Sequence, residues 1–284
     1  MLYNQLTKLP KEIIRNKIKE FIKEDSPNGD ITAESSIDEK QVSSCNITAR
    51  EAIVLSGIDI IDEFLDGKND IVKNFKDGDQ LQQGDIIATI KANTIEILRF
   101  ERIILNLMQK MCGIATTTKA YVQIAEPFGV KILDTRKTTP GLRVFEKYSV
   151  VMGGGTNHRY DLSQGIMLKD NHLQAIGSIT EAVKRMRNKY PSKVIEVEVD
   201  NFDQLKEVLK TDVDAILLDN FSPDETMSAV NYVRENQSKK LFIESSGGIN
   251  LSNLKHYVNK GIDAISSGAL THSVKASDIG FDFI

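Results

Sequence analysis

The chain has 284 residues, of which 40% are hydrophobic and 27% are charged. That length suits two average domains or one large α/β barrel, and the composition supports a sizeable core. The formal net charge of −4 argues against nucleic acid as the main partner. The longest apolar runs, such as residues 52–55 and 215–218, are far shorter than the roughly twenty residues of a membrane-spanning helix, so no membrane partner is expected.

The cysteines and the N-terminal residues indicate the compartment. Cys45 and Cys112 are far apart and show no CxxC spacing, which speaks against a disulfide framework and a zinc site. The first twenty residues alternate charge with isoleucine and lack the apolar run of a signal peptide. We therefore expect a reduced, cytoplasmic protein.

The first third of the chain predicts a small mixed α/β domain over roughly residues 1–92. Residues 10–25 have the apolar spacing of an amphipathic helix, residues 46–57 are rich in strand formers, and residues 58–65 indicate a short helix. Residues 75–91 alternate around Asp-Gly and Gly-Asp turns, as in a biotin or lipoyl carrier, but lack the Met-Lys-Met or Asp-Lys-Ala of such carriers. Residues 94–125 have a helical pattern in which Gly113 predicts a break.

After residue 129 the pattern changes to alternating strands and helices. Strands are expected at 130–133, 165–168, 194–199, 215–218, 241–243 and 263–266, and helices at 180–190, 202–210, 224–235 and 252–258. Such βαβ units predict a parallel sheet. Because the dinucleotide-binding glycine fingerprint is missing, we favour a barrel, closed or incomplete, over an open Rossmann sheet.

Charged or hydroxyl side chains stand at the end of every expected strand. In a parallel barrel these carboxyl ends and the following loops form the active site. In chain order they are Asp134, Lys169, Glu198, Asp219, Glu244 with Ser246, and Ser267. Six such positions in register favour a functional site over ordinary polar strand exits.

The segment 134–169 predicts a strongly anionic ligand. It holds six basic residues against three acids, and its bases lie in Gly- and Thr-rich loops rather than at the spacing of a solvated helix face. Arginine binds carboxylates and phosphates in a bidentate manner, and lysine supplies a point charge. The turns Ser246-Gly247-Gly248 and Ser267-Gly268-Ala269 follow the last two strands, where glycine lets backbone N–H groups approach a phosphate.

The acids and histidines allow more than one interpretation. Glu198 and Asp219 suit Mg²⁺ or ribose hydroxyls, but they could instead pair with Lys169 and Arg159. His158 lies in the basic loop and is expected to bind or orient an anion, whereas His172, His256 and His272 are expected to be structural or superficial. No HxxH, HExxH or GxSxG motif is present, so neither a catalytic transition metal nor covalent catalysis is predicted.

Residues 134–172, DTRKTTPGLRVFEKYSVVMGGGTNHRYDLSQGIMLKDNH, resemble the signature region of the quinolinate phosphoribosyltransferase (nicotinate-nucleotide pyrophosphorylase, carboxylating) family. The resemblance continues through Asn28–Thr32, ERIILNLMQKMCGIAT at 101–116, VIEVEVDN, AILLDN, ESSGGI and ISSGALTHS. It covers nearly the whole chain.

This resemblance implies an open (incomplete) parallel α/β barrel, residues 113–269, with an N-terminal α/β sandwich domain, residues 1–112, which the C-terminal tail 270–284 joins. It also implies a homo-oligomer, dimer or hexamer, in which Arg102 reaches the neighbouring subunit's site. The implied substrate-binding residues are Arg102, Thr135, Arg136, Lys137, His158, Arg159, Lys169, Glu198, Asp219, Ser246, Gly247, Gly248, Ser267, Gly268 and Ala269. Of these, Lys137, Lys169, Glu198 and Asp219 are expected to be catalytic, and Glu198 and Asp219 to serve a Mg²⁺ cofactor directly or indirectly.

The implied reaction is phosphoribosyl transfer from phosphoribosyl pyrophosphate to quinolinate with decarboxylation, which yields nicotinate mononucleotide, pyrophosphate and CO₂ in NAD biosynthesis. Three alternatives stay open. They are a molybdenum-transport-associated relative of the same fold with another substrate, a non-catalytic phosphosugar-binding barrel, and a nicotinate phosphoribosyltransferase. The intact segments Thr138–Gly141 and Asn157–Arg159 favour the quinolinate enzyme over the molybdenum-associated relative, and the surplus of cations favours a dicarboxylate over nicotinate.

Overall fold

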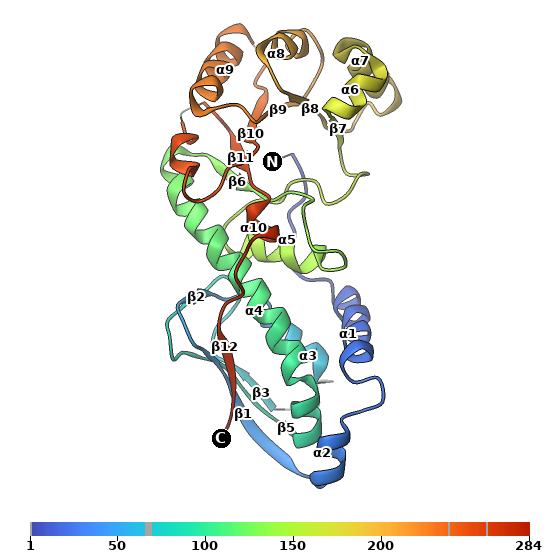
Figure 1. The fold of residues 1–284 in the computed structure, drawn as a ribbon, viewed down its shortest axis with the longest axis vertical. Helices are drawn as coiled ribbons and strands as arrows, with labels where there is room; N and C mark the ends of the chain where they lie inside the picture. The colour runs from blue at the N-terminus through green and yellow to red at the C-terminus, as the bar shows by residue number, and fades with distance from the viewer. Residues whose placement is uncertain (1, 66–69, 238, 260) are drawn as a thin grey trace. The chain divides into compact units, whose positions relative to one another are not determined.

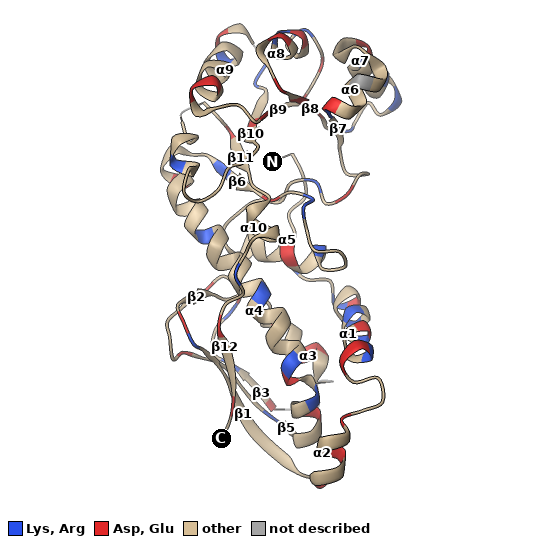
Figure 2. Ribbon diagram, viewed as in Figure 1, with Lys and Arg blue, Asp and Glu red and all other residues tan. Residues whose placement is uncertain are grey.

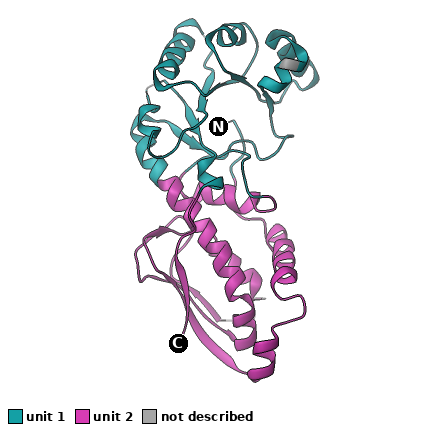
Figure 3. Ribbon diagram, viewed as in Figure 1, with its two compact units in different colours: residues 1–5, 120–139, 155–273 teal, residues 6–119, 140–154, 274–284 magenta. Residues whose placement is uncertain are grey.

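The chain divides into two compact units, each built from several segments. The computed structural model describes residues 2–65, 70–237, 239–259 and 261–284. One unit, the barrel unit, comprises residues 1–5, 120–139 and 155–273, and the other, the sandwich unit, comprises residues 6–119, 140–154 and 274–284 (Figure 3). The predicted domain boundaries, a cut between residues 112 and 113 and a tail from residue 270, stay a prediction. Within the described ranges, no helix is long and apolar enough to cross a membrane.

The sandwich unit combines an antiparallel sheet with helices (Figure 1). Its four-stranded sheet has the order β12-β1-β5-β3, and strands β2 and β4 form a separate pair. The strands are β1 Val42–Ala49, β2 Ile53–Val54, β3 Asp70–Lys73, β4 Gln80–Leu81, β5 Ile86–Asn93 and β12 Ile279–Phe283. The helices are α1 Lys11–Asp25, α2 Ile31–Ser36, α3 Ile60–Phe64, α5 Arg143–Met152 and α4 Thr94–Ala125, whose last turns belong to the barrel unit.

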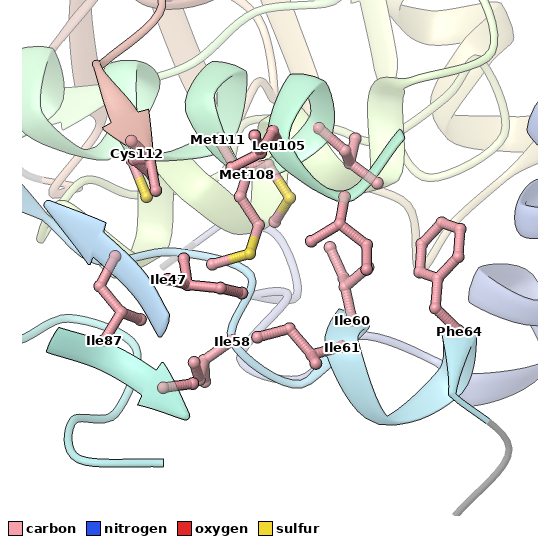
Figure 4. Close-up of a cluster of buried hydrophobic side chains, with 14 of the residues drawn as sticks. Ile47, Ile58, Ile60, Ile61, Phe64, Ile87, Leu105, Met108, Met111 and Cys112 are labelled. Carbon is pink, nitrogen blue, oxygen red and sulfur yellow. The ribbon is translucent and has the colours of Figure 1, made fainter. Parts of the chain in front are cut away.

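The apolar pattern of the sequence explains how this unit is held together. Helix α1 buries Ile14 and Ile18, which lie one turn apart, while its other positions carry both signs of charge (Figure 2). Strand β1 alternates between buried and partly exposed positions. Both elements pack on one hydrophobic core, part of which is drawn in Figure 4: Ile47, Ile58, Ile60, Ile61, Phe64, Ile87, Leu105, Met108, Met111 and Cys112.

Helix α4 is continuous, so the predicted break at Gly113 is wrong. A Cβ atom at this position would lie 2.3 Å from the backbone oxygen of Lys275. Glycine is therefore required for the close approach of the C-terminal segment. The helix tolerates the local cost of about 1 kcal/mol because packing stabilises it on both sides of Gly113.

The barrel unit contains the predicted parallel sheet. Six strands pair in the order β6-β11-β10-β9-β8-β7, and every pairing is parallel. They are β6 Lys131–Leu133, β7 Ile166–Leu168, β8 Ile195–Val199, β9 Ala215–Asp219, β10 Phe242–Ser246 and β11 Ala264–Ser266. Among the described residues β6 and β7 do not pair with each other, so the barrel is open and the predicted fold class is confirmed.

Short helices connect these strands, and α7, α8 and α9 lie outside the sheet (Figure 1). The α-helices are α6 Asp170–Ile176, α7 Ile179–Lys189, α8 Phe202–Val208, α9 Pro223–Asn236 and α10 Ala269–His272, and 3₁₀ turns occupy Glu126–Phe128 and Leu254–His256. The helix expected over 252–258 is thus reduced to a 3₁₀ turn. The side chain of Asn250 accepts the N–H of Ser252, and that of Asn253 accepts the N–H of Asn250, so side chains take the place of helical partners.

Candidate active site

A cavity of about 700 Å³ opens at the carboxyl ends of the barrel strands. Every residue of its wall belongs to the barrel unit. The wall includes all but one of the site residues that the sequence predicts: Thr135, Arg136, Lys137, His158, Arg159, Lys169, Glu198, Asp219, Ser246, Gly247, Gly248, Ser267, Gly268 and Ala269. The exception is Arg102, which is part of the sandwich unit.

The wall also contains residues that the sequence analysis did not select. They are Met167, Leu217, Ile249, Asn250, Ser266, His272 and Ser273, together with Glu244, which was noted only as a strand end. For the residues that lie on strands, the two-residue period of a strand could have identified them from the sequence. Leu217 precedes Asp219 by two positions, and Glu244 precedes Ser246 in the same way. Side chains one step deeper in each strand thus form the floor of the cavity.

Arg136 and Lys137 supply positive charge from the loop after β6. The Nε atom of Arg136 is buried and has no hydrogen-bond partner among the described residues. The loop is held at two points: the backbone N–H of Lys137 donates to Thr135 Oγ1 over 3.0 Å, and its carbonyl accepts from Thr271 Oγ1 over 2.6 Å. Both contacts involve the backbone, so the loop is anchored without occupying the two cationic groups.

Asp134 lies behind this wall. Its side chain is fully buried, and it accepts the backbone N–H of His158 over 2.8 Å and the Asn157 amide over 2.6 Å. Its place at a strand end predicts a role in the active site, but in the structure Asp134 instead holds the 157–159 loop through these hydrogen bonds. The Arg159 guanidinium that this loop carries donates to the carbonyl of Gly165 over 3.1 Å and lines the cavity.

An ion pair joins two of the predicted catalytic residues. Lys169 Nζ contacts Glu198 Oε2, whereas Asp219 accepts a hydrogen bond from Asn220 Nδ2 over 2.7 Å. Burial raises the pKa of Glu198 although Lys169 lowers it, and the charge of Asp219 raises it further. The pKa of Asp219 is likewise raised, first by burial. Glu198 therefore has the salt-bridge role that the sequence left open, and Asp219 is the less committed carboxylate.

The Ser246-Gly247-Gly248 turn needs glycine at its centre. Gly247 has a φ of +99°, and a Cβ there would lie 2.3 Å from Asn220 Oδ1. Gly248 has a φ of +63°, and no atom lies within 4 Å of where a Cβ would lie, so the space beside this part of the turn is open. At the second turn, a Cβ on Gly268 would lie 2.8 Å from the Lys137 side chain, which brings this turn beside the basic loop.

His158 faces carboxylates as well as the cavity. Its Nε2 lies 3.1 Å from Glu196 Oε2 and 3.5 Å from Glu244 Oε2, and Tyr3 stacks on its ring at 4.9 Å. Although burial lowers the pKa of His158, the two glutamates raise it to about 9. The expected role of His158 in binding an anion stays a prediction, because both of these contacts tie it to acids of the wall.

Sequence comparison identifies the family. The model of the quinolinate phosphoribosyl transferase N-terminal domain matches residues 30–112, and that of the C-terminal domain matches residues 114–282. The chain belongs to the quinolinate phosphoribosyl transferase family. A Bacillus subtilis relative described as a probable nicotinate-nucleotide pyrophosphorylase [carboxylating] is 41% identical over 95% of this chain and 93% of its own length. A Mycobacterium leprae relative described as nicotinate-nucleotide pyrophosphorylase [carboxylating] is 40% identical over 94% of this chain and 96% of its own length.

Solved structures of the family agree with this fold. The nicotinate-nucleotide pyrophosphorylase from Francisella tularensis superposes with a TM-score of 0.93 at 35% identity, covering 99% of both chains. In the present member of the quinolinate phosphoribosyl transferase family, the predicted site residues gather at one cavity with the exception of Arg102. That arginine has a side chain that is 63% exposed and lies 3.8 Å from Glu101.

Proposed function

We propose that this protein transfers the phosphoribosyl group of phosphoribosyl pyrophosphate to quinolinate and releases pyrophosphate and CO₂, leaving nicotinate mononucleotide. The observation that carries the proposal is the cavity itself. It combines four cations, Arg136, Lys137, Arg159 and Lys169, with three acids and two glycine turns, in a chain that belongs to the quinolinate phosphoribosyl transferase family along almost its full length. Such a cavity suits one ligand with two carboxylates and a second with phosphates.

The basic wall would hold the two carboxylates of quinolinate. Arg136 follows β6, Arg159 lies in the loop that Asp134 organises, and both line the cavity. The Nε of Arg136 is buried without a partner among the described residues. A carboxylate brought to this group would form a charge-assisted pair in a site shielded from water. Lys137 adds a point charge to the same wall. Thr135 would assist through its hydroxyl.

The glycine turns of the cavity would hold the phosphoribosyl group. The Ser246-Gly247-Gly248 and Ser267-Gly268-Ala269 turns offer backbone amides to its 5-phosphate. Glu198 and Asp219 lie at the ends of neighbouring parallel strands. Burial raises the pKa of both carboxyl groups, and the charge of Asp219 raises that of Glu198 further. Two carboxylates of this kind fit Mg²⁺, which commonly takes one or two protein carboxylates together with substrate phosphates. We therefore propose Mg²⁺ as the cofactor; when bound it would neutralise the pyrophosphate leaving group.

The residues of this chain would contribute mainly by binding and orientation. Two polyanions repel each other, and fixed cations remove that cost by holding them in one cavity. Lys137 and Lys169 would stabilise the negative charge that collects on pyrophosphate as the bond to the ribose breaks. The pyridine nitrogen then bonds to the anomeric carbon and becomes positively charged. That charge stabilises the electron pair left on the adjacent ring carbon when CO₂ departs.

We also propose that the protein forms a homo-oligomer, a dimer or a hexamer, in which Arg102 completes the site of a neighbouring subunit. The exposure of Arg102 and its absence from the wall of the cavity support this arrangement. A cytoplasmic location is supported by Cys45 and Cys112, which are both buried free thiols.

One assay tests the main proposal. Purified protein is incubated with Mg²⁺ and phosphoribosyl pyrophosphate, and with either quinolinate or nicotinate, and the products are identified by mass. We expect nicotinate mononucleotide and CO₂ from quinolinate, and no product from nicotinate. Turnover of nicotinate in preference to quinolinate, or of neither compound, would refute the proposal.

A further inference from the structure

The floor of the cavity contains a buried acid pair that the proposed chemistry has not used. Glu196 and Glu244 come from strands β8 and β10, and both are fully buried. Each carboxylate has an oxygen within 3.5 Å of His158 Nε2. Oε1 of each glutamate makes no well-formed hydrogen bond to a described residue. Two ionised carboxylates in such a site would be costly, so the pair must hold either a metal ion or a proton.

The contacts of His158 favour a proton. Its Nδ1 accepts the backbone N–H of Arg159 over 2.7 Å, so the hydrogen of the neutral ring is on Nε2, the nitrogen that faces the two acids. A metal ion would need the lone pair of Nε2, and a histidine that ligates through Nε2 normally donates from Nδ1 rather than accepts there. The cluster therefore has the hydrogen-bond pattern of a proton store.

Besides the hydrogen on His158 Nε2, the cluster holds a second proton, which we assign to Glu244. Burial raises the pKa of Glu244 to about 7, Glu196 raises it too, and His158 opposes both effects. The glutamates raise the pKa of His158 as well, so the histidine and Glu244 share one proton. Because His158 Nδ1 already accepts the N–H of Arg159, a second hydrogen on the ring would cost that hydrogen bond, and we assign the shared proton to Glu244. Within the described part of the chain, the cluster also has charged or titratable neighbours in Tyr3 from the N-terminal segment, Asp134 after β6, and Arg159 from the 157–159 loop.

Glu244 is the acid of this pair that faces the cavity. It lines the wall together with His158, Leu217 and Met167, whereas Glu196 does not. Leu217 is its direct neighbour in register on β9. A protonated carboxyl group thus lies beside apolar side chains on the floor of the cavity. The four cations and the other two acids, Glu198 and Asp219, are already assigned to the charged groups of the substrates and to Mg²⁺.

Resting on the proposed function, we propose that Glu244 is the acid that protonates the pyridine ring when CO₂ departs. In this step the bond between the ring carbon and its carboxylate breaks, and the electron pair stays on that carbon. In the same step the O–H bond of Glu244 breaks, its proton forms the new C–H bond with that electron pair, and Glu244 becomes a carboxylate, so loss of the acid slows the release of CO₂ itself. It takes up a proton from solvent after the product leaves, so the cycle is balanced and needs no further reactant.

The test compares the release of pyrophosphate with the release of CO₂ in single turnovers. Quinolinate labelled in the carboxylate that is lost reports CO₂, and a coupled assay reports pyrophosphate. In Glu244→Gln, pyrophosphate should appear near the wild-type rate while CO₂ appears roughly 100-fold more slowly, as expected when a general acid is removed. The dicarboxylate mononucleotide should accumulate and be visible by mass. The matched control, Glu196→Gln, removes a neighbouring buried carboxyl group and should release both products one to one.

Each other outcome is decisive. If Glu244→Gln releases both products together, whether at the wild-type rate or equally slowed, Glu244 is not the proton donor. If the wild-type protein releases neither product, the proposed function itself fails. Should Glu244→Gln not fold, the wild-type protein gives the answer: CO₂ release must lag increasingly behind pyrophosphate release as the pH rises above about 7, where Glu244 loses its proton. A constant ratio across that range overturns the inference.

Discussion

Lys169 and Glu198 form an ion pair between the end of strand β7 and the neighbouring strand β8, and both line the cavity. This pair separates two roles that the sequence could not distinguish for the acids of the site. Glu198 neutralises Lys169, whereas Asp219 accepts a hydrogen bond from the adjacent amide of Asn220 and has no salt bridge within the described residues. Asp219 is therefore the carboxylate that is more available to a hard cation.

We expect Asp219→Asn to raise the Mg²⁺ requirement without harming the fold. The substitution keeps the shape of the side chain but removes the charge that Mg²⁺ needs. Quinolinate affinity should be almost unchanged, while the Mg²⁺ concentration for half-maximal turnover should rise at least roughly tenfold, equivalent to about 1.4 kcal/mol. Thermal melts with and without quinolinate provide the control. A large loss of apo stability that quinolinate restores, with unchanged Mg²⁺ dependence, would show that Asp219 acts as an ion-pair partner instead.

Replacing Arg159 with alanine should weaken the binding of quinolinate selectively. A charge-assisted hydrogen bond contributes about 1.5–3 kcal/mol, which corresponds to at least about a tenfold loss of affinity. The affinity for phosphoribosyl pyrophosphate should change little. Because Arg159 also donates to the carbonyl of Gly165, circular dichroism and a melt must accompany the binding titrations. Equal losses for the two ligands would assign Arg159 a structural role or a contact with phosphate.

The acid pair on the cavity floor predicts how stability depends on pH. An ordinary glutamic acid titrates near about 4.3, whereas Glu244 in the folded protein titrates at about 7. Between these values the folded state binds more protons than the unfolded state, so the free energy of unfolding should fall as the pH rises. Glu244→Gln should flatten this part of the profile. Urea titrations at several pH values measure the effect, and a profile equally steep in the variant would contradict the assignment.

The sequence predicted which residues line the cavity better than it predicted their burial and their hydrogen-bond partners. Strand ends are visible in a sequence because a polar residue such as Asp219 follows an apolar run. Depth is not visible: Asp134 occupies an equivalent position, yet it is buried behind the wall and holds the 157–159 loop. Glu196 and Glu198 alternate in one strand in which all five residues are buried, and nothing in the sequence shows that Tyr3 and His158 contact the first of these acids. Gly113 looked like a helix break because its packing partner, Lys275, is more than a hundred residues away.

Arg102 lies outside the cavity wall in the described chain, and a mixing experiment can determine whether it acts on a neighbouring subunit. Arg102→Ala and Lys137→Ala should each be inactive alone. In a two-fold symmetric dimer that shares its sites, a hybrid of the two variants regains one intact site, so random exchange in a 1:1 mixture should restore about a quarter of the wild-type activity. The matched control mixes Arg136→Ala with Lys137→Ala; because both residues line the same cavity, no hybrid contains an intact site, and activity should stay absent. Native mass spectrometry must confirm that subunits have exchanged. If exchange is complete and the first mixture remains as inactive as the control, Arg102 and Lys137 serve the same subunit's site and the shared-site arrangement is wrong.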